Sequence, residues 1–182
     1  MATAAATAAF VARASQRLGA SGGRQRTIGQ LAVSPFGFGA YRLAEGDVNS
    51  PSLQHCLEDG IVNVIDTSSS YSDGASESRI GDVVADTLAR GTVKREEIVI
   101  VTKIGHVPAG QEPLPENCVS IARDGGEPGK HSIHPAWLQQ QCVLGPTSCH
   151  LLSDLCHFLT DFGTVLAAGS PSQPPGKMLI LY

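Results

Sequence analysis

Two nearly continuous apolar runs divide the middle of the chain. Residues 61–66 read IVNVID and residues 97–104 read EIVIVTKI, and neither run has many polar side chains. Such strands are typical of a parallel sheet that is covered on both faces. Between them, mostly apolar residues recur at helical spacing from Ile80 to Leu88, which predicts a helix capped by Ser76. The alternation of strands and helices predicts repeated βα units.

Turn signals extend this pattern toward the N-terminus. Gly29 lies inside residues 25–33, which predicts a short hairpin. Residues 36–43 read FGFGAYRL and predict a strand fragment interrupted by glycines. A cap at Ser50, followed directly by proline, predicts a helix that ends at Gly60.

The pattern weakens after the second apolar run. Residues 105–130 mix prolines, glycines and charges and are predicted to be loop, and residues 132–141 predict one more helix. Residues 142–182 differ in character and are predicted to be an unrelated tail, partly helical or disordered. Within it, residues 149–162 form a seven-residue repeat with an amphipathic helical stripe. This stripe could dock on a sheet or on another chain. One alternative for the function is therefore a non-catalytic fragment or interaction protein that uses this repeat.

The cysteines and histidines of this repeat do not predict a metal site. Positions seven apart on a straight helix are separated by about 10.5 Å, whereas zinc ligands lie about 2.0–2.3 Å from the ion. One ion therefore cannot collect Cys149, His150, Cys156 and His157.

Composition narrows the class of protein. With 182 residues and 42% hydrophobic content, the chain fits one globular domain, and its net charge of −4 does not favour binding to nucleic acid. The sequence contains no run of about 18 apolar residues, so it predicts no membrane span. The five cysteines are odd in number and irregularly spaced in the front part of the chain, which predicts reduced thiols. Residues 1–24 hold alanine, serine and arginine without acids, which predicts a plastid or mitochondrial presequence or a disordered or weakly helical segment, and so an organellar or cytoplasmic protein.

Asp66, Tyr71 and Lys103 carry the candidate chemistry. Asp66 ends one predicted strand, Lys103 lies near the end of the next, and Tyr71 follows Asp66 by five residues. Reactive groups gather beyond the C-terminal ends of parallel strands, so all three would meet at one rim. An ammonium lowers the pKa of a neighbouring phenol, which could then donate a proton to a carbonyl oxygen. In the alternative interpretation, Asp66 is a helix or turn cap, Tyr71 is an exposed loop aromatic and Lys103 is a solvated residue at a strand end.

Three segments resemble the aldo-keto reductase family. Residues 36–43 resemble its first barrel strand, and Thr102-Lys103 ends a segment similar to its third. The segment VIDTSSSYSDGASESRIG resembles the family signature at the positions Asp66, Thr67, Tyr71, Gly74, Ser76, Glu77 and Gly81.

This resemblance implies a fold and an activity. The fold would be a (β/α)₈ barrel whose bottom is closed by a small hairpin. The activity would be NADP(H)-dependent reduction of small aldehydes or ketones, or the reverse oxidation of alcohols. Tyr71 would donate the proton, with Lys103 and Asp66 supporting it. The implied cofactor contacts are Gly39, Ala40, Tyr41 and Asp66.

The chain departs from the family in two respects. The family's catalytic histidine ends a fourth strand that we do not find, since His106 follows Lys103 too closely and His131 and His134 precede the helix that should come before that strand. The resemblance covers residues 25–141, whereas a closed barrel needs about 250 residues. We therefore predict an α/β fold that is a partial TIM barrel: three βα units after a hairpin. Such a chain would be inactive by itself, with open sheet edges that could self-associate.

Overall fold

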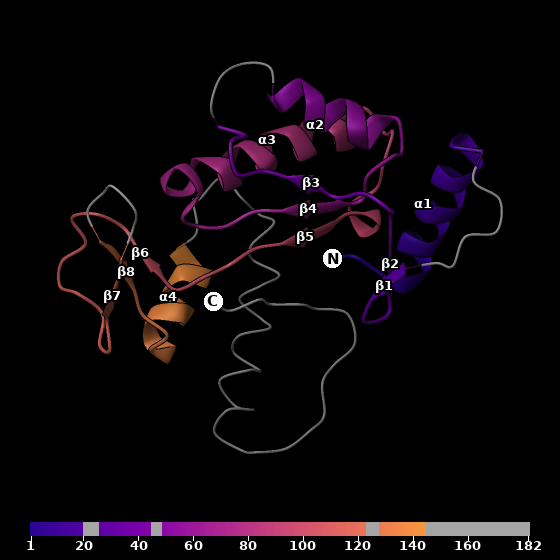
Figure 1. Ribbon diagram of the computed structural model, residues 1–182. Coiled ribbons are helices and arrows are strands. Elements are labelled where there is room, and N and C mark those ends of the chain that lie inside the picture. Colours follow the sequence, from indigo (N-terminus) through magenta and orange to yellow (C-terminus); the bar gives the residue numbers. More distant parts are fainter. Residues whose placement is uncertain (20–25, 45–48, 123–127, 145–182) are drawn as a thin grey trace.

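The computed structural model describes residues 1–19, 26–44, 49–122 and 128–144 (Figure 1). The repeat at 149–162, with the metal site considered there, and almost all of the predicted tail at 142–182 lie outside these residues. Within the described residues, no helix combines the length and the apolar character needed to cross a bilayer.

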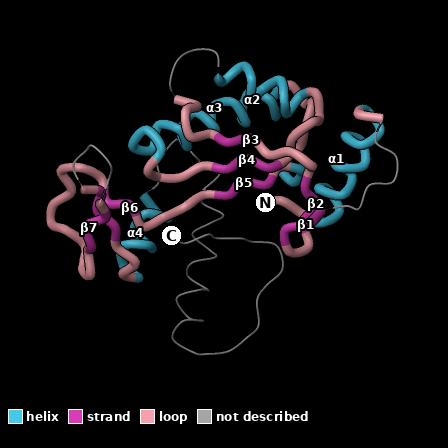
Figure 2. The backbone as a smooth tube through the Cα atoms, viewed as in Figure 1, coloured by secondary structure: helices cyan, strands magenta, loops and turns pink. Residues whose placement is uncertain are grey.

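A three-stranded parallel sheet forms the centre of the structure. Its order is β3 (Phe38–Gly39), β4 (Val64–Asp66) and β5 (Val99–Val101), with α2 (Asn49–Glu58) following β3 and α3 (Ala75–Ala89) following β4. Both helices lie on the same face of the sheet (Figures 1 and 2). The predicted alternation of parallel strands and helices is confirmed, and in the part of the chain that is described the sheet does not close into a barrel.

The core lies between this sheet and its two helices. Ile65 of β4 is 0% exposed and packs in one cluster with apolar residues of both helices. Leu53 and Leu57 come from α2, and Ile80 and Val84 come from α3. Their spacings of four residues place each pair on one face of its helix. The apolar residues that recur at helical spacing in the sequence are therefore the ones that pack in the core.

A hairpin lies at the end of the sheet where the parallel strands begin. Strands β1 (Arg26–Ile28) and β2 (Leu31–Val33) pair antiparallel, and Gly29 adopts a φ of +57° in the turn between them. The predicted hairpin is confirmed. Leu31 packs on Val99 and Val101, so the hairpin reaches the face of the sheet that the two helices leave uncovered.

The N-terminal segment corrects one expectation. Residues Ala4–Arg17 form the helix α1, so for this part the disordered alternative is wrong and the helical alternative holds, while the presequence remains a prediction. Phe10 and Ala14 are each 1% exposed and join the main core cluster. The Thr7 hydroxyl accepts a hydrogen bond of 3.1 Å from the Ala32 N–H of β2. The alanine-rich composition concealed this apolar face because only a few of its residues are large.

An ion pair fixes α1 to the base of the sheet and gives a first prediction. Arg13 donates to the carboxylate of Glu97 at 2.6 Å, and Glu97 lies in the short helix η2 (Arg95–Glu97) just before β5. Arg13→Ala leaves a nearly buried carboxylate without its cation, and because Arg13 itself is half exposed, we expect a loss of about 1 kcal/mol in the free energy of unfolding. Urea denaturation measures this, with Gln16→Ala on the exposed side of the same helix as control. Equal stability of the two variants would contradict it.

The segment after β5 corrects a second expectation. Residues 105–130, predicted to be loop, contain β6 (His106–Val107), β7 (Val119–Ile121) and most of β8 (Gly129–His131), which form an antiparallel sheet in the order β6-β8-β7. Strands of two or three residues are too short to show a hydrophobic period. The helix that follows, α4 (Pro135–Leu144), agrees with the predicted one. This sheet and α4 lie at the other end of the molecule from the hairpin (Figure 2).

Candidate active site at the strand ends

The central sheet brings Asp66 and Lys103 to the same edge. Asp66 is the last residue of β4 and pairs in register with Val101, the last residue of β5. Lys103 follows two residues later, so its side chain reaches back over the ends of both strands. The backbone holds this junction, because the Thr67 N–H donates to the Val101 carbonyl at 2.8 Å.

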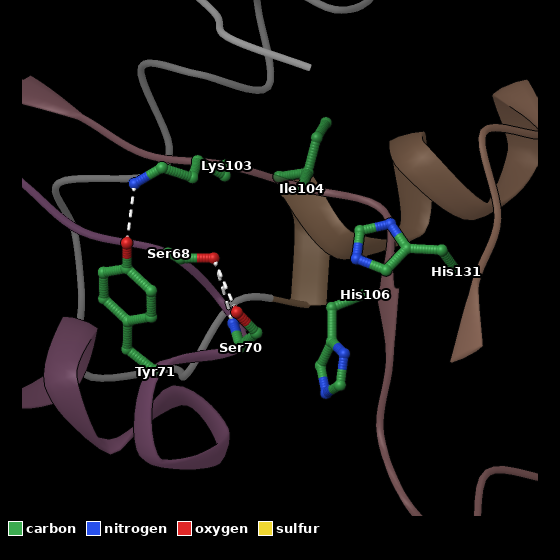
Figure 3. A pocket seen from close by; sticks show the side chains of 7 residues that line it. All are labelled: Ser68, Ser70, Tyr71, Lys103, Ile104, His106 and His131. Carbon is green, nitrogen blue, oxygen red and sulfur yellow. Dashed lines mark hydrogen bonds between the residues drawn. The ribbon is translucent and has the colours of Figure 1, made fainter. Parts of the chain in front are cut away.

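The Lys103 ammonium group is the centre of the cluster. Its Nζ lies 2.7 and 3.0 Å from the two carboxylate oxygens of Asp66 and 2.9 Å from the Thr67 carbonyl. It also lies 3.0 Å from the hydroxyl of Tyr71 (Figure 3). The structure thus brings together the three residues that the sequence predicted. The alternative reading, in which Lys103 is a solvated strand end and Tyr71 an unattached loop aromatic, does not fit these distances.

The surroundings of Lys103 keep it charged. Burial lowers the pKa of the ammonium group, but the hydrogen bonds to Asp66 and Tyr71 and the negative charge of Asp66 raise it more, so the pKa lies above its ordinary value. Lys103 therefore stays protonated across the neutral range. A permanent positive charge is thus held 3.0 Å from a phenol oxygen.

The serine-rich loop fixes the position of Tyr71. The Tyr71 N–H donates to the Ser68 carbonyl at 3.1 Å, and the hydroxyls of Ser68 and Ser70 lie 2.9 Å apart. Tyr71 begins the short helix η1 (Tyr71–Gly74), and its ring meets the edge of Tyr41 with centroids 5.0 Å apart. These local bonds explain the small polar residues between Asp66 and the tyrosine.

Ser76 has a different role from the predicted one. Helix α3 starts at Ala75 after Gly74, whose φ of +88° favours glycine, so Ser76 is not the cap. Its buried hydroxyl instead donates to the Ala40 carbonyl at 2.7 Å and lies 3.2 Å from the hydroxyl of Thr67. Ser76 thereby ties α3 to the ends of β3 and β4, behind the cluster.

Glu77 supports the same region and yields a second prediction. It is 5% exposed and accepts a hydrogen bond of 2.6 Å from the hydroxyl of Thr102. Burial raises the pKa of Glu77, and the bond from Thr102 lowers it by less. A raised carboxyl pKa means that the folded state binds the proton more tightly than the unfolded state does. The contribution of Glu77 to the free energy of unfolding is therefore largest below about pH 4.5 and falls as the pH rises through the pKa of the folded state.

Glu77→Gln removes this titration but keeps an acceptor for Thr102. We therefore expect the stability of the variant relative to the parent to increase as the pH is raised from about 4.5 toward neutrality, since only the parent must ionise a buried carboxyl. Chemical denaturation at a series of pH values measures the difference. A difference that is constant with pH, or that decreases, would contradict the assignment.

The predicted cofactor contacts divide into exposed and buried positions. Gly39 pairs in register with Asp66, and a Cβ added to it would meet no atom within 4 Å, so space is open beside its backbone. Tyr41 is 61% exposed next to it. Ala40 is 0% exposed, its N–H donates to the Asp66 carbonyl and its own carbonyl accepts from Ser76, which speaks against a contact there. Gly39, Tyr41 and Asp66 are therefore accessible at this edge of the sheet, whereas Ala40 is not.

A cavity of about 150 Å³ opens beside the cluster. It is lined by Ser68, Ser70, Tyr71, Lys103, Ile104, His106 and His131 (Figure 3). The sequence predicts neither histidine as the family's histidine, because His106 is close to Lys103 in the chain and His131 precedes a helix. The pairing of β6 with β8 places them opposite each other, with ring centroids 6.0 Å apart. Among the described residues, no group of histidines, cysteines and carboxylates is arranged to hold a metal ion.

A comparison with known protein families covers this site. The sequence model of the Aldo/keto reductase family matches residues 35–133, more than half of the chain, and this stretch contains all three residues of the cluster. Among solved structures, the chain is similar to the aldo-keto reductase AKR11C1 from Bacillus halodurans in its holo form, with 21% identity over 69% of this chain and 35% of that one and a TM-score of 0.47. It is also similar to the glycerol dehydrogenase AKR11B4 from Gluconobacter oxydans, with 18% identity over 69% and 35% of the two chains and a TM-score of 0.46.

The two solved structures are also longer than this chain. The chain spans about a third of the length of the two solved structures. The family assignment itself depends on the sequence model, whose match covers the strand ends, the tyrosine loop and the lysine. On this basis the chain belongs to the aldo/keto reductase family.

Proposed function

We propose that this chain carries the proton-donating site of an NADP(H)-dependent reductase of small aldehydes and ketones, with Tyr71 as the acid. The observation that carries the proposal is the position of the Lys103 ammonium, which lies 3.0 Å from the Tyr71 hydroxyl and 2.7 Å from the carboxylate of Asp66. A carboxylate, an ammonium and a phenol in sequence form a unit that can release a proton and hold the charge that remains.

In the reduction, the Tyr71 hydroxyl gives its proton to the carbonyl oxygen, which becomes the alcohol. Lys103 stabilises the phenolate that is left, because opposite charges at this distance attract strongly in a partly buried site. Asp66 keeps the ammonium in place and compensates its charge. NADPH, when bound, supplies the hydride that the carbonyl carbon receives. In the reverse direction, the phenolate accepts the proton of an alcohol.

The residues that would hold the cofactor lie along one edge. The open backbone at Gly39, the exposed ring of Tyr41 and the carboxylate of Asp66 adjoin the strand ends. We infer further that β3, β4 and β5 are the first three strands of a (β/α)₈ barrel, which is supported by the hairpin at the opposite end of the sheet and by the family match. In such a barrel, active sites lie at the C-terminal ends of the strands.

NADPH fluorescence and consumption test the proposal on the 182-residue chain. The sequence predicts a chain that is inactive by itself, but because the structure brings Tyr71, Lys103 and Asp66 together, we expect NADPH emission to change on addition of the protein and NADPH to be consumed when propanal is added. Asp66→Asn should weaken both, because it removes the charge that holds Lys103 and one contact at the cofactor edge. A chain that neither binds NADPH nor consumes it would contradict the proposal for these residues and favour the alternative of a non-catalytic fragment.

A further inference from the structure

We propose that Gln141 is a positioning residue for Lys103, because its side-chain amide fixes the backbone that follows β5 and so keeps the ammonium group beside the Tyr71 hydroxyl. This inference rests on the proposed function, since it adds a residue to the same proton-donating unit. Gln141 lies in α4, beyond residues 35–133 that the family model matches, so the family assignment does not supply this role.

Lys103 lies between two strands, so its position depends on the bonds of the segment that carries it. Strand β5 ends at Val101, and β6 begins at His106. From the tyrosine loop, the Ser69 N–H and the Ser69 hydroxyl donate to the Lys103 carbonyl at 3.3 and 3.2 Å. Both distances exceed the usual range for such bonds, so this side of the segment is held weakly.

The Gln141 amide binds the same segment from α4 with two short bonds. Its oxygen accepts from the Gly105 N–H at 2.7 Å, and its nitrogen donates to the His106 carbonyl at 2.7 Å. In an extended strand the polar groups of successive residues point to opposite sides. The φ of +112° at Gly105 departs from that conformation, and one amide can therefore bind both residues.

The residues on either side of Gly105 also pack on α4. Their apolar cluster consists of Ile104, Val107, Trp137 and Leu138. Apolar contacts of this kind hold the helix against the segment but have no direction of their own. The orientation of the peptide groups after Lys103 is therefore set by hydrogen bonds, and the two shortest of these come from Gln141.

The side chain of Lys103 is sensitive to a small shift of this backbone. Its Nζ makes four hydrogen bonds of 2.7–3.0 Å to Asp66, Thr67 and Tyr71. Burial lowers the pKa of Lys103, and the bonds to Asp66 and Tyr71 raise it by more. A shift of about 1 Å would lengthen these bonds beyond hydrogen-bond distance. A displaced Lys103 would thus lose part of the increase in its pKa and react more readily as a free amine.

Labelling with acetic anhydride, read by mass spectrometry, tests this role without turnover, because only the uncharged amine reacts. In Gln141→Leu, which has a similar volume but no polar group, we expect labelling of Lys103 relative to Lys94 to rise about threefold or more. The Gly105 amide should exchange its hydrogen about tenfold faster, as the loss of one hydrogen bond allows. The matched control is Gln140→Leu at the exposed neighbouring position, which should change neither measurement.

Gln141→Glu separates the two bonds of the amide. It keeps an acceptor for the Gly105 N–H but has no donor for the His106 carbonyl. Exchange at Gly105 should therefore stay slow, while labelling of Lys103 should lie between that of the parent and that of Gln141→Leu.

Turnover distinguishes a positioning role from a merely structural one. In Gln141→Leu, kcat for propanal reduction should fall about tenfold, whereas KM for NADPH should stay within about twofold of the parent. The reason is that Gly39 and Tyr41 of the cofactor edge lie at β3, which β4 separates from β5. A general loss of stability would instead appear in thermal unfolding without this division between kcat and KM.

Thermal unfolding verifies that each variant is folded, and Gln141→Asn, which is too short to reach both groups, replaces Gln141→Leu if the latter does not fold. Unchanged labelling of Lys103, or an unchanged kcat when the parent is active, would overturn the inference while leaving the proposed function intact. Faster labelling in a chain that consumes no NADPH would support the positioning of Lys103 by Gln141 while contradicting the proposed function.

Discussion

Replacing Tyr71 by phenylalanine is expected to lower the rate of aldehyde reduction by about 10²–10⁴-fold, which is the usual contribution of a positioned acid. The variant keeps the ring that packs edge-on against Tyr41 and loses only the hydroxyl that lies 3.0 Å from Lys103. The proton donor is therefore removed while the packing is retained. The loss should appear in kcat and in kcat/KM equally, because proton donation takes place only in the transition state.

The control for this variant is Ser78→Ala, which removes a hydroxyl from the first turn of α3, where it donates to the Gly74 carbonyl at 3.4 Å. It should leave the rate within about twofold of the parent, since a weak local bond of this kind contributes little. Steady-state NADPH consumption measures both variants, and thermal unfolding verifies that both are folded. A Tyr71→Phe variant that is as fast as the Ser78→Ala control would contradict the assignment of Tyr71 as the proton donor.

Asn63→Leu is expected to destabilise the fold by about 3 kcal/mol or more. Asn63 is 0% exposed, and its side chain accepts from the Ser34 N–H at 2.8 Å and donates to the carbonyls of Ala32 and Glu97 at 3.0 and 3.2 Å. It therefore connects the hairpin to the segments that lead into β4 and β5. Leucine has a similar volume but leaves all three backbone groups buried without this partner, at about 1–3 kcal/mol each.

Urea denaturation measures this loss, with Asn49→Ala as the matched control. The Asn49 amide donates to the Arg42 carbonyl at 2.7 Å, and this bond is exposed. Water replaces an exposed partner at little cost, so this variant should lose well under about 1 kcal/mol. Comparable losses in the two asparagine variants would show that the buried network does not stabilise the sheet as described.

The central sheet and the three residues of the cluster could be predicted because their signals are local. The apolar runs at 61–66 and 97–104 fix the two strands, and in parallel strands the C-terminal ends meet at one edge. Asp66 and Lys103 stand at those ends, so their proximity follows from the strands alone. The position of Tyr71 needed only the short loop that follows Asp66.

The remaining parts depend on contacts between distant positions. His106 and His131 meet through a pairing of strands too short to show a period, and it is the cavity that shows that they lie near Tyr71. Asn63 reads as one polar residue in an apolar run, and nothing nearby in the sequence shows that its partners are 29 to 34 residues away. The sequence predicts helix α1 only as a weakly helical alternative, because alanine gives little hydrophobic signal, and it does not predict that Phe10 packs in the core.

The most direct test of the account is a double-mutant cycle on Tyr71 and Lys103, read as kcat/KM for NADPH-dependent reduction of propanal. If the ammonium acts only through the phenol 3.0 Å away, Tyr71→Phe combined with Lys103→Met should be about as slow as the slower single variant, because residues that act as one unit are strongly non-additive. If the two losses multiply instead, the residues act independently, and the proton-donating unit described here would be contradicted.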